Sequence, residues 1–203
     1  MTDLEKPVAA SPKNLLDAIE GRNIVFVGLM GAGKTSIGRR VAARLGIPFF
    51  DSDHEIEGAS RMTIPELFEA YGEAEFRALE ERVLHRLLSE NPRVVSTGGG
   101  AFMNPAIREE IRATGLSVWL NADLDVLMER VKKRQNRPLL RAADPVAVMK
   151  RLMEERYPVY ATADIVVKTR DAHRDVIVEE VLQAMEGFLD RSKVPVSQEQ
   201  PSS

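Results

Sequence analysis

The sequence predicts an α/β fold of three layers, in which helices cover both faces of a central, mostly five-stranded parallel sheet. Three observations support this prediction. Short apolar runs rich in β-branched residues alternate with stretches of helical periodicity along the 203 residues. Each run is apolar along most of its length, as expected for a strand buried on both faces. The motifs with recognisable chemistry directly follow these runs, at the strand ends where such sheets gather their ligand sites.

The strands are recognised as short apolar runs, of which NIVFV is the first. The expected strands are Asn23–Val27, Ile47–Phe50, Arg93–Ser96, Leu116–Leu120 and Ile165–Lys168.

The helices are recognised by apolar residues three and four positions apart. Ile64–Leu88 is expected to form one or two amphipathic helices with a single apolar stripe. Ser11 and Pro12 favour the start of a short helix that Gly21 can end. The other expected helices are Gly33–Leu45, Pro105–Ala113, Leu124–Arg134, Pro145–Glu155 and Arg174–Leu189.

The chain is expected to hold one domain at residues 22–191, because its length favours a single well-cored unit. Residues 1–21 are expected to be an extension, partly disordered with a short helix, and the polar residues 192–203 a disordered tail.

A net charge of −3 gives no broad attraction for nucleic acid or an anionic membrane. The absence of cysteine excludes disulfides and thiolate metal sites. Without an apolar leader or a membrane-length stretch, the expected location is cytoplasmic.

The segment GLMGAGKT, from Gly28 to Thr35, matches G-x-x-x-x-G-K-[ST] and lies between an expected strand and an expected helix. Such a loop binds the phosphates of a nucleoside triphosphate, here ATP, through backbone N–H groups and the helix N-terminus. Lys34 is expected to reach the β- and γ-phosphates, and Thr35 to bind Mg²⁺. The alternative is a glycine-rich turn without a ligand. The expected phosphate contacts are Gly31, Ala32, Gly33, Lys34, Thr35 and Ser36.

This loop does not identify the reaction, because GTPases, motors and small-molecule kinases share it. A GTPase normally carries N-K-x-D for guanine, and this chain has no Asn-Lys pair. Motors and transport ATPases usually need a longer chain. The sequence therefore favours a small kinase.

Asp51 and Asp53 directly follow the second expected strand. On extended backbone, residues two apart face the same way, so both carboxylates can point toward the site. Asp51 would then face the hydrated metal and Asp53 an acceptor hydroxyl. A helix cap or turn is an equally good interpretation of the two aspartates.

Arg77 lies beside Phe76, a member of the apolar stripe, and therefore near the edge of the buried face. Its guanidinium can form a bidentate bridge with a substrate carboxylate. The alternative is an ordinary helix-surface pair with Glu73 or Glu81 at a spacing of four residues.

Three consecutive glycines, Gly98 to Gly100, follow the third expected strand and suit a backbone that approaches a ligand closely. A flexible turn is the alternative.

The basic stretch from Arg130 to Arg141 is either a solvated face or a lid over the phosphates. Arg137 precedes a proline and is expected in a loop. Arg156 can form a second anion clamp.

In order and spacing, these motifs resemble shikimate kinase from about Asn23 to Thr169: GLMGAGKT, DSD, GEAEFR, STGGG, NRPLL and ERYPVY. The resemblance implies a P-loop kinase fold with a mobile lid at about residues 130–143. It also implies transfer of the γ-phosphate of MgATP to the 3-hydroxyl of shikimate, a step toward chorismate and the aromatic amino acids.

The resemblance also assigns roles to residues. The implied shikimate contacts are Asp53, Arg77, Gly98, Gly99, Gly100 and Arg156. Arg137 corresponds to the lid arginine and Arg130 to the arginine that stacks on adenine. Lys34, Arg137 and Mg²⁺ would supply positive charge, and Asp53 would orient or deprotonate the attacking hydroxyl.

Two other functions remain open from the residues alone. One is another small-metabolite kinase, such as a gluconate kinase, which shares the P-loop but has less need of the other motifs. The second is a non-catalytic nucleotide-binding module, for which Lys34, Thr35 and Asp51 would be superfluous. The expected ligands are shikimate and ATP, and the expected oligomeric state is a monomer.

Overall fold

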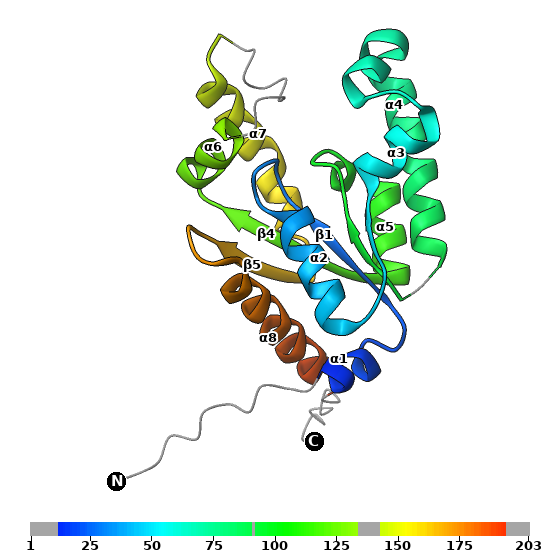
Figure 1. The fold of residues 1–203 in the computed structure, drawn as a ribbon, viewed down its shortest axis with the longest axis vertical. Helices are drawn as coiled ribbons and strands as arrows, with labels where there is room; N and C mark the ends of the chain where they lie inside the picture. Colours follow the sequence, from blue (N-terminus) through cyan, green and yellow to red (C-terminus); the bar gives the residue numbers. More distant parts are fainter. Residues whose placement is uncertain (1–11, 91, 134–142, 194–203) are drawn as a thin grey trace, which may run out of the picture.

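The computed structural model describes residues 12–90, 92–133 and 143–193, and it confirms the predicted α/β architecture (Figure 1). Five parallel strands form one sheet in the order β2-β3-β1-β4-β5. The strands are β1 Asn23–Val27, β2 Phe49–Asp51, β3 Val94–Ser96, β4 Gly115–Ala122 and β5 Ile165–Thr169. The helices are α1 Pro12–Ala18, α2 Lys34–Leu45, α3 Ser52–Ser60, α4 Ile64–Ser89, η1 Ala101–Met103, α5 Pro105–Thr114, α6 Leu124–Lys132, α7 Pro145–Tyr160 and α8 Arg174–Lys193.

The order of the strands explains how the helices are distributed over the two faces of the sheet. The connection through α2 carries the chain from β1 to the edge strand β2, and the later crossovers return in the opposite direction. Because parallel crossovers are right-handed, a reversal of direction places the next helices on the other face. Accordingly, α2 packs beside α8 with α1 at their end, and α4 packs beside α5 (Figure 1).

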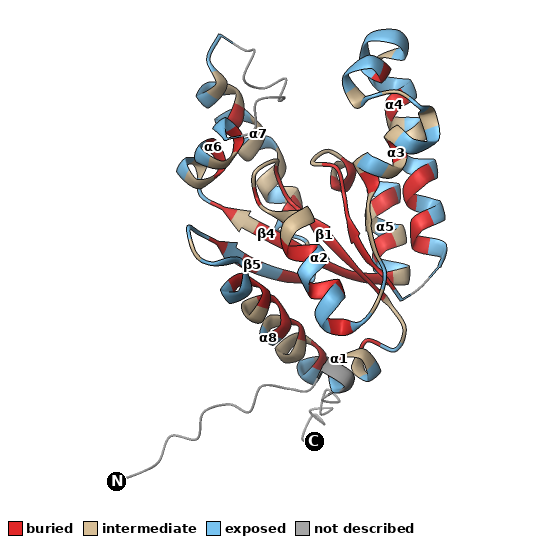
Figure 2. Ribbon diagram, viewed as in Figure 1, coloured by how far each residue is buried: buried red, intermediate tan, exposed pale blue. Residues whose placement is uncertain are grey.

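The core lies along the central strands, where Figure 2 shows continuous burial. All five residues of β1 are buried, including Asn23, whose amide bonds the carbonyl of Leu88 at 3.0 Å. Strand β5 instead alternates, with Val166 49% exposed, because it is an edge strand. The apolar runs therefore predicted the strands well, and the departures from full burial lie mostly in the two edge strands, β2 and β5.

The predicted helix at Ile64–Leu88 is helix α4, which bends at Gly72. Gly72 has φ 77° and ψ 178°, values outside the helical range, so the chain forms two helical segments joined at a kink. A capping box between Thr63 and Glu66 starts the first segment. The predicted apolar stripe from Phe76 to Leu88 is buried except for the partly buried Leu79, which fixes the second segment against the core.

Several predicted boundaries are wrong by one to five residues, among them the end of α8, which is Lys193 and not Leu189; two have a clear cause. Strand β2 begins at Phe49 and not at Ile47, since Pro48 has no N–H to donate to a neighbouring strand. Helix α7 continues through Pro158 to Tyr160, beyond the predicted end at Glu155. Packing explains the continuation, because the ring of Tyr157 lies 5.0 Å from that of Trp119 on β4. Tertiary contacts thus outweigh the helix-ending tendency of proline here.

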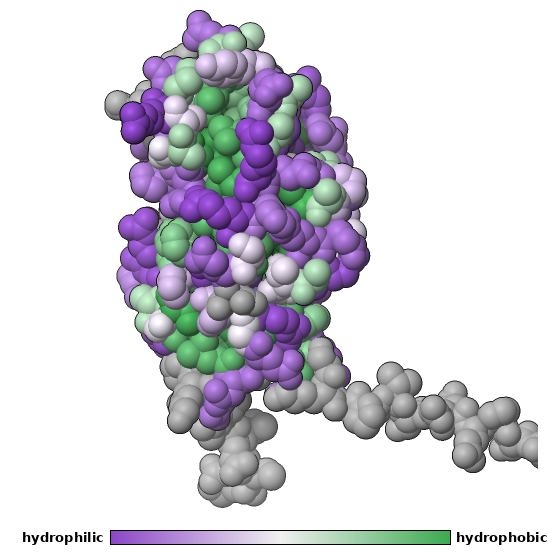
Figure 3. Space-filling model, turned by 90° about the vertical axis from the view of Figure 1, so that its right-hand side faces the viewer, coloured by the Kyte–Doolittle hydropathy of each residue, from purple (hydrophilic) through white to green (hydrophobic). Residues whose placement is uncertain are grey.

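Figure 3 shows the side of the molecule formed by α3, α4 and α5, where hydrophilic side chains surround separate, smaller hydrophobic areas. Among the residues that the structure describes, no helix is both long and apolar enough to cross a membrane.

Candidate active site

One cavity of about 750 Å³ opens at the carboxyl ends of the strands. Its wall contains every predicted site residue that falls within the described ranges. These are Gly31, Ala32, Gly33, Lys34, Thr35, Ser36, Asp51, Asp53, Arg77, Gly98, Gly99, Gly100, Arg130 and Arg156. Arg137 and most of the predicted lid lie outside the described residues. The fold thus brings together motifs that are up to 125 positions apart, from Gly31 to Arg156.

The loop between β1 and α2 has the backbone that phosphate binding requires. Gly28 has φ 136°, and a Cβ at this position would lie 2.9 Å from the carbonyl oxygen of Leu120. Gly33, at φ 103°, starts α2 without a side-chain cap. The first N–H groups of α2 have no acceptor within their own helix, and its dipole adds positive charge at the cavity wall. This arrangement suits an anion.

Lys34 provides the cation of this wall. Its ammonium donates to the carbonyl oxygens of Gly28 at 2.8 Å and Leu29 at 3.1 Å, both in the same loop. The side chain therefore lies folded over the loop that it would help to bind phosphate.

Oxygen ligands converge beside the loop. The hydroxyl of Thr35 donates to the Asp51 carboxylate at 2.7 Å and lies 3.5 Å from the hydroxyl of Ser96. Within the described ranges, no three His, Cys, Asp or Glu side chains cluster as a metal site. A hydroxyl and one carboxylate nevertheless suit Mg²⁺, which prefers oxygen and usually keeps several waters and substrate oxygens as ligands.

Asp51 and Asp53 do not lie together on one extended strand, so the prediction that placed them on one face of it is wrong. Asp51 ends β2, but Asp53 lies in the first turn of α3. The Asp51 carboxylate caps this helix by accepting from the N–H of Asp53 at 3.2 Å. The helix-cap interpretation is confirmed for Asp51, and both residues also line the cavity.

Side-chain packing favours glycine at Gly98 and Gly100, and unusual backbone angles do not, since none of the three glycines after β3 has a positive φ. A Cβ at Gly98 would lie 2.7 Å from Oδ1 of Asp53 and 2.8 Å from Oε1 of Glu80. At Gly100 it would lie 2.5 Å from Nη1 of Arg77. At Gly99 the nearest side-chain atom is Nη1 of Arg156, at 3.6 Å. Each glycine therefore lies directly against a different charged group of the cavity.

Arg77 forms the predicted helix-surface pair and also lines the cavity. It pairs with Glu73, as predicted for a helix surface, with Nη2 at 3.1 Å from the carboxylate. The predicted alternative partner Glu81 is wrong, because that side chain accepts from Asn104 at 2.9 Å. Burial acts to lower the pKa of Arg77, but bonds to Glu80 and Glu73 outweigh it and raise the pKa. The residue is a firmly charged cation that lines the cavity.

Glu80 is a site residue that the sequence did not reveal. It is 1% exposed and accepts from Nη1 of Arg77 at 2.7 Å. Its other oxygen, Oε1, is buried without a hydrogen-bond partner among the described residues. Burial raises the pKa of the Glu80 carboxyl, and Arg77 only partly opposes this shift. Glu80 thus holds the Arg77 guanidinium in place, although burying the Glu80 carboxylate away from water is itself unfavourable.

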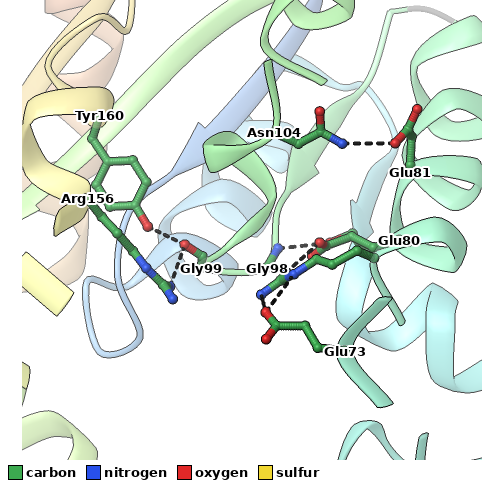
Figure 4. Close-up of polar contacts among 10 residues, drawn as sticks. Glu73, Glu80, Glu81, Gly98, Gly99, Asn104, Arg156 and Tyr160 are labelled. Carbon is green, nitrogen blue, oxygen red and sulfur yellow. Dashed lines mark hydrogen bonds and ion pairs between the residues drawn. The ribbon is translucent and has the colours of Figure 1, made fainter. Parts of the chain in front are cut away.

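Helix α7 contributes Arg156 and Tyr160, whose polar ends both point to the carbonyl of Gly99 (Figure 4). Nη1 of Arg156 donates to this oxygen at 3.0 Å, and the hydroxyl of Tyr160 donates to the same atom. Burial raises the pKa of Tyr160 to about 12, with Arg156 opposing in part, so the hydroxyl stays protonated. Tyr160 was not predicted as a site residue.

Arg130 lies at the other end of the cavity and links two loops. Its guanidinium donates to the carbonyls of Gly31 and Ala32, each at 3.3 Å, and to that of Arg170 at 2.6 Å. Burial lowers the pKa of Arg130, which nevertheless remains a strong base.

The connection from β5 to α8 is a part of the wall that motif reasoning missed. It contributes Thr169, Asp171, Ala172, His173 and Arg174. A signal was present, because the carboxyl end of a fifth parallel strand belongs to the same edge as the other motifs. No signal of this kind exists for Ser52, whose buried hydroxyl accepts from the N–H of Gly98 at 3.0 Å.

The similarity of this chain to known proteins identifies its family independently of the site geometry. Residues 30–186 match the family described as shikimate kinase. A curated shikimate kinase from Mesorhizobium japonicum is 64% identical over 179 residues, which are 88% of each chain. A solved shikimate kinase from Acinetobacter baumannii, in complex with shikimate, is 35% identical with a TM-score of 0.78, over 89% of this chain and 99% of that one. A gluconokinase from Sinorhizobium meliloti is only 20% identical with a TM-score of 0.56, over 85% and 95%, and so shares the fold alone.

Proposed function

The chain belongs to the shikimate kinase family and transfers phosphate from ATP to shikimate, and we propose that the cavity described above holds the two substrates at opposite ends. The proposed acceptor atom is the 3-hydroxyl of shikimate, which makes the product shikimate 3-phosphate. The family assignment agrees with the resemblance inferred from the motifs.

One observation supports this arrangement most strongly. Among the cations that line the cavity, Lys34 lies at the glycine loop, and Arg77 and Arg156 lie on either side of the Gly98–Gly100 segment. Shikimate is a small carboxylate with three hydroxyl groups, so paired guanidinium groups suit its charge. The glycine loop with Lys34 suits the phosphates of ATP.

At the phosphate end, the loop from Gly31 to Ser36 would hold the β- and γ-phosphates against its N–H groups. Thr35 and Asp51 would hold Mg²⁺, directly or through water. When bound, this ion neutralises charge on the phosphate oxygens. Lys34, which bonds the carbonyls of Gly28 and Leu29 in this structure, would turn toward the γ-phosphate.

At the acceptor end, Arg77 and Arg156 would hold the carboxylate of shikimate, and Asp53 would bind ring hydroxyls. We propose that Asp53 orients the attacking hydroxyl. A loose phosphoryl-transfer transition state depends mainly on position and on charge stabilisation, so proton removal by Asp53 is not required early in the step. Catalysis thus follows from holding two anions close together in the correct geometry.

Arg130 would contact the adenine ring, and Arg137 would place its charge over the transferred phosphate. For Arg130, this proposal rests on its place in the cavity wall between the glycine loop and the residues after β5. For Arg137 it rests on the NRPLL motif alone.

We further propose a monomeric, cytoplasmic enzyme. All groups assigned to the two substrates come from one chain, so the site needs no second copy. ATP, its co-substrate, is abundant in the cytoplasm. Light scattering at the concentration of the kinetic assay tests the oligomeric state, and a dimer mass would contradict the proposal.

The assignment of the acceptor end is tested by comparing shikimate with its methyl ester. The ester keeps the ring and all three hydroxyls but removes the negative charge that Arg77 and Arg156 would bind. We expect calorimetry to show affinity at least tenfold weaker for the ester, about the value of one charged hydrogen bond. Equal affinity for acid and ester would exclude the two arginines as the carboxylate site.

A further inference from the structure

Tyr160 has a hydroxyl that the packing of its ring does not explain. The residue is 0% exposed, and its ring lies 6.0 Å from that of Trp119 and 6.3 Å from that of Phe102. A phenylalanine would fill this aromatic cluster equally well. The hydroxyl instead points out of the cluster and donates to the carbonyl oxygen of Gly99 (Figure 4).

The carbonyl of Gly99 is also the anchor of Arg156. The two donors lie four residues apart on α7, one helical turn, so their side chains leave the same face. Nη1 of Arg156 bonds this carbonyl oxygen, and the Nε of Arg156 is buried without a partner among the described residues. The direction of the guanidinium therefore depends on this carbonyl oxygen and on the Tyr160 hydroxyl beside it.

Gly99 is confined on its other side by the phosphate-binding loop. A Cβ at Gly99 would lie 3.6 Å from the carbonyl oxygen of Gly28 and 3.8 Å from the N–H nitrogen of Met30. The peptide thus lies between the two halves of the cavity. With both Tyr160 and Arg156 donating, its carbonyl oxygen has both lone pairs engaged and cannot turn toward the loop without losing a bond.

We infer that Tyr160 is a positioning residue for shikimate. Its hydroxyl fixes the Gly99 carbonyl and, through this shared acceptor, the guanidinium of Arg156 that faces the carboxylate of the substrate. The inference rests on the proposed function, because it takes Arg156 as part of the shikimate site. Tyr160 itself is behind the glycine segment and is absent from the cavity wall.

The test is Tyr160→Phe, which removes the hydroxyl and keeps the ring. We expect the KM for shikimate to rise about three- to tenfold, the usual effect of one hydrogen bond. Calorimetry should show the same loss of shikimate affinity. The KM for ATP should stay within twofold of the wild type, because the hydroxyl has no contact with the phosphate-binding residues.

Tyr157→Phe is the matched control. Tyr157 lies on the same helix and in the same aromatic cluster, and its hydroxyl donates to the carbonyl of Ala122 at 2.5 Å, away from the glycine segment. We expect unchanged KM values for both substrates. If both variants lower the melting temperature equally and change both KM values alike, the hydroxyl of Tyr160 is merely structural and the inference fails.

Arg156→Ala separates this inference from the proposed function. In that background, Tyr160→Phe should add no further rise in the KM for shikimate, because it acts through Arg156. If Arg156→Ala raises this KM but Tyr160→Phe does not, the positioning role is overturned while the shikimate site stands. If Arg156→Ala leaves shikimate binding unchanged, the proposed site is itself wrong.

Discussion

The buried carboxylate of Glu80 bonds the guanidinium of Arg77 at 2.7 Å, one helical turn apart on α4. Arg77 also pairs with the exposed Glu73. The bond to Glu80 helps to hold its guanidinium against the glycine segment. The acceptor end of the cavity is therefore built from a partly desolvated ion pair, and its pH dependence follows from that burial.

Glu80→Gln should change how stability varies with pH. Burial raises the pKa of Glu80 in the folded protein above its ordinary value of 4.5. The folded state then holds this proton more tightly than the unfolded state, so stability falls as pH rises from 4.5 through the raised pKa. Urea unfolding at pH values from 4.5 to the raised pKa should show that the wild type loses stability relative to Glu80→Gln as the pH rises. A difference independent of pH would contradict the raised pKa.

Arg77→Ala should raise the KM for shikimate by about ten- to a hundredfold, since a charged, bidentate contact is lost. The KM for ATP should change little. Arg86→Ala is the control, because Arg86 lies on the same helix and pairs with Glu55 at 2.7 Å away from the cavity. Normal shikimate kinetics with a lower melting temperature for Arg77→Ala would instead support a helix-surface role.

Gly100→Ala should reduce kcat/KM for shikimate by about ten- to a hundredfold, as expected when a binding group is displaced by about 1 Å. The new Cβ would meet the end of the flexible Arg77 side chain at 2.5 Å, and the backbone at φ −98° tolerates alanine. The fold should therefore survive while the guanidinium moves.

Gly58→Ala is the matched control for this substitution. A Cβ at Gly58, within α3, has nothing within 4 Å. We expect unchanged kinetics and a gain of about 0.5–1 kcal/mol in the free energy of unfolding. Equal kinetics for Gly100→Ala and Gly58→Ala would show that the packing of Arg77 on Gly100 has no role in binding.

Lys34→Ala should lower kcat by about a hundredfold or more, as for the loss of a group that stabilises developing charge. Lys150→Ala, which removes an exposed lysine on α7, should leave kcat unchanged. Steady-state rates at saturating ATP and shikimate are the measurement. A Lys34→Ala variant with wild-type kcat would remove Lys34 from the mechanism.

Arg137→Ala should lower kcat while leaving ATP affinity within a fewfold of the wild type, because its proposed contact is with the transferred phosphate. Calorimetric titration with ATP and a turnover assay test the two parts separately. Unchanged turnover would exclude Arg137 from the reaction.

The fold could be predicted because buried parallel strands carry their signal in local composition. NIVFV at β1 is apolar after Asn23, and most strands are followed by turn residues and then by helical spacing. The boundaries at Pro48 and Pro158 were less accurate, since packing against neighbours decides where these elements start and end.

The site could be predicted where a motif follows a strand, as for Lys34 and Gly98. Glu80 could not be found in this way, because α4 contains several glutamates and only the fold buries this one. Tyr160 could not be found from a motif either. Its role depends on a carbonyl 61 positions away in the sequence.

The central claim, that this cavity transfers phosphate from ATP to shikimate, is tested most directly by ADP release. The enzyme with MgATP is assayed with shikimate, with gluconate and with neither acceptor. The account predicts rapid ADP release with shikimate and only background release in the other two reactions. Comparable release with gluconate, or none with shikimate, would contradict it.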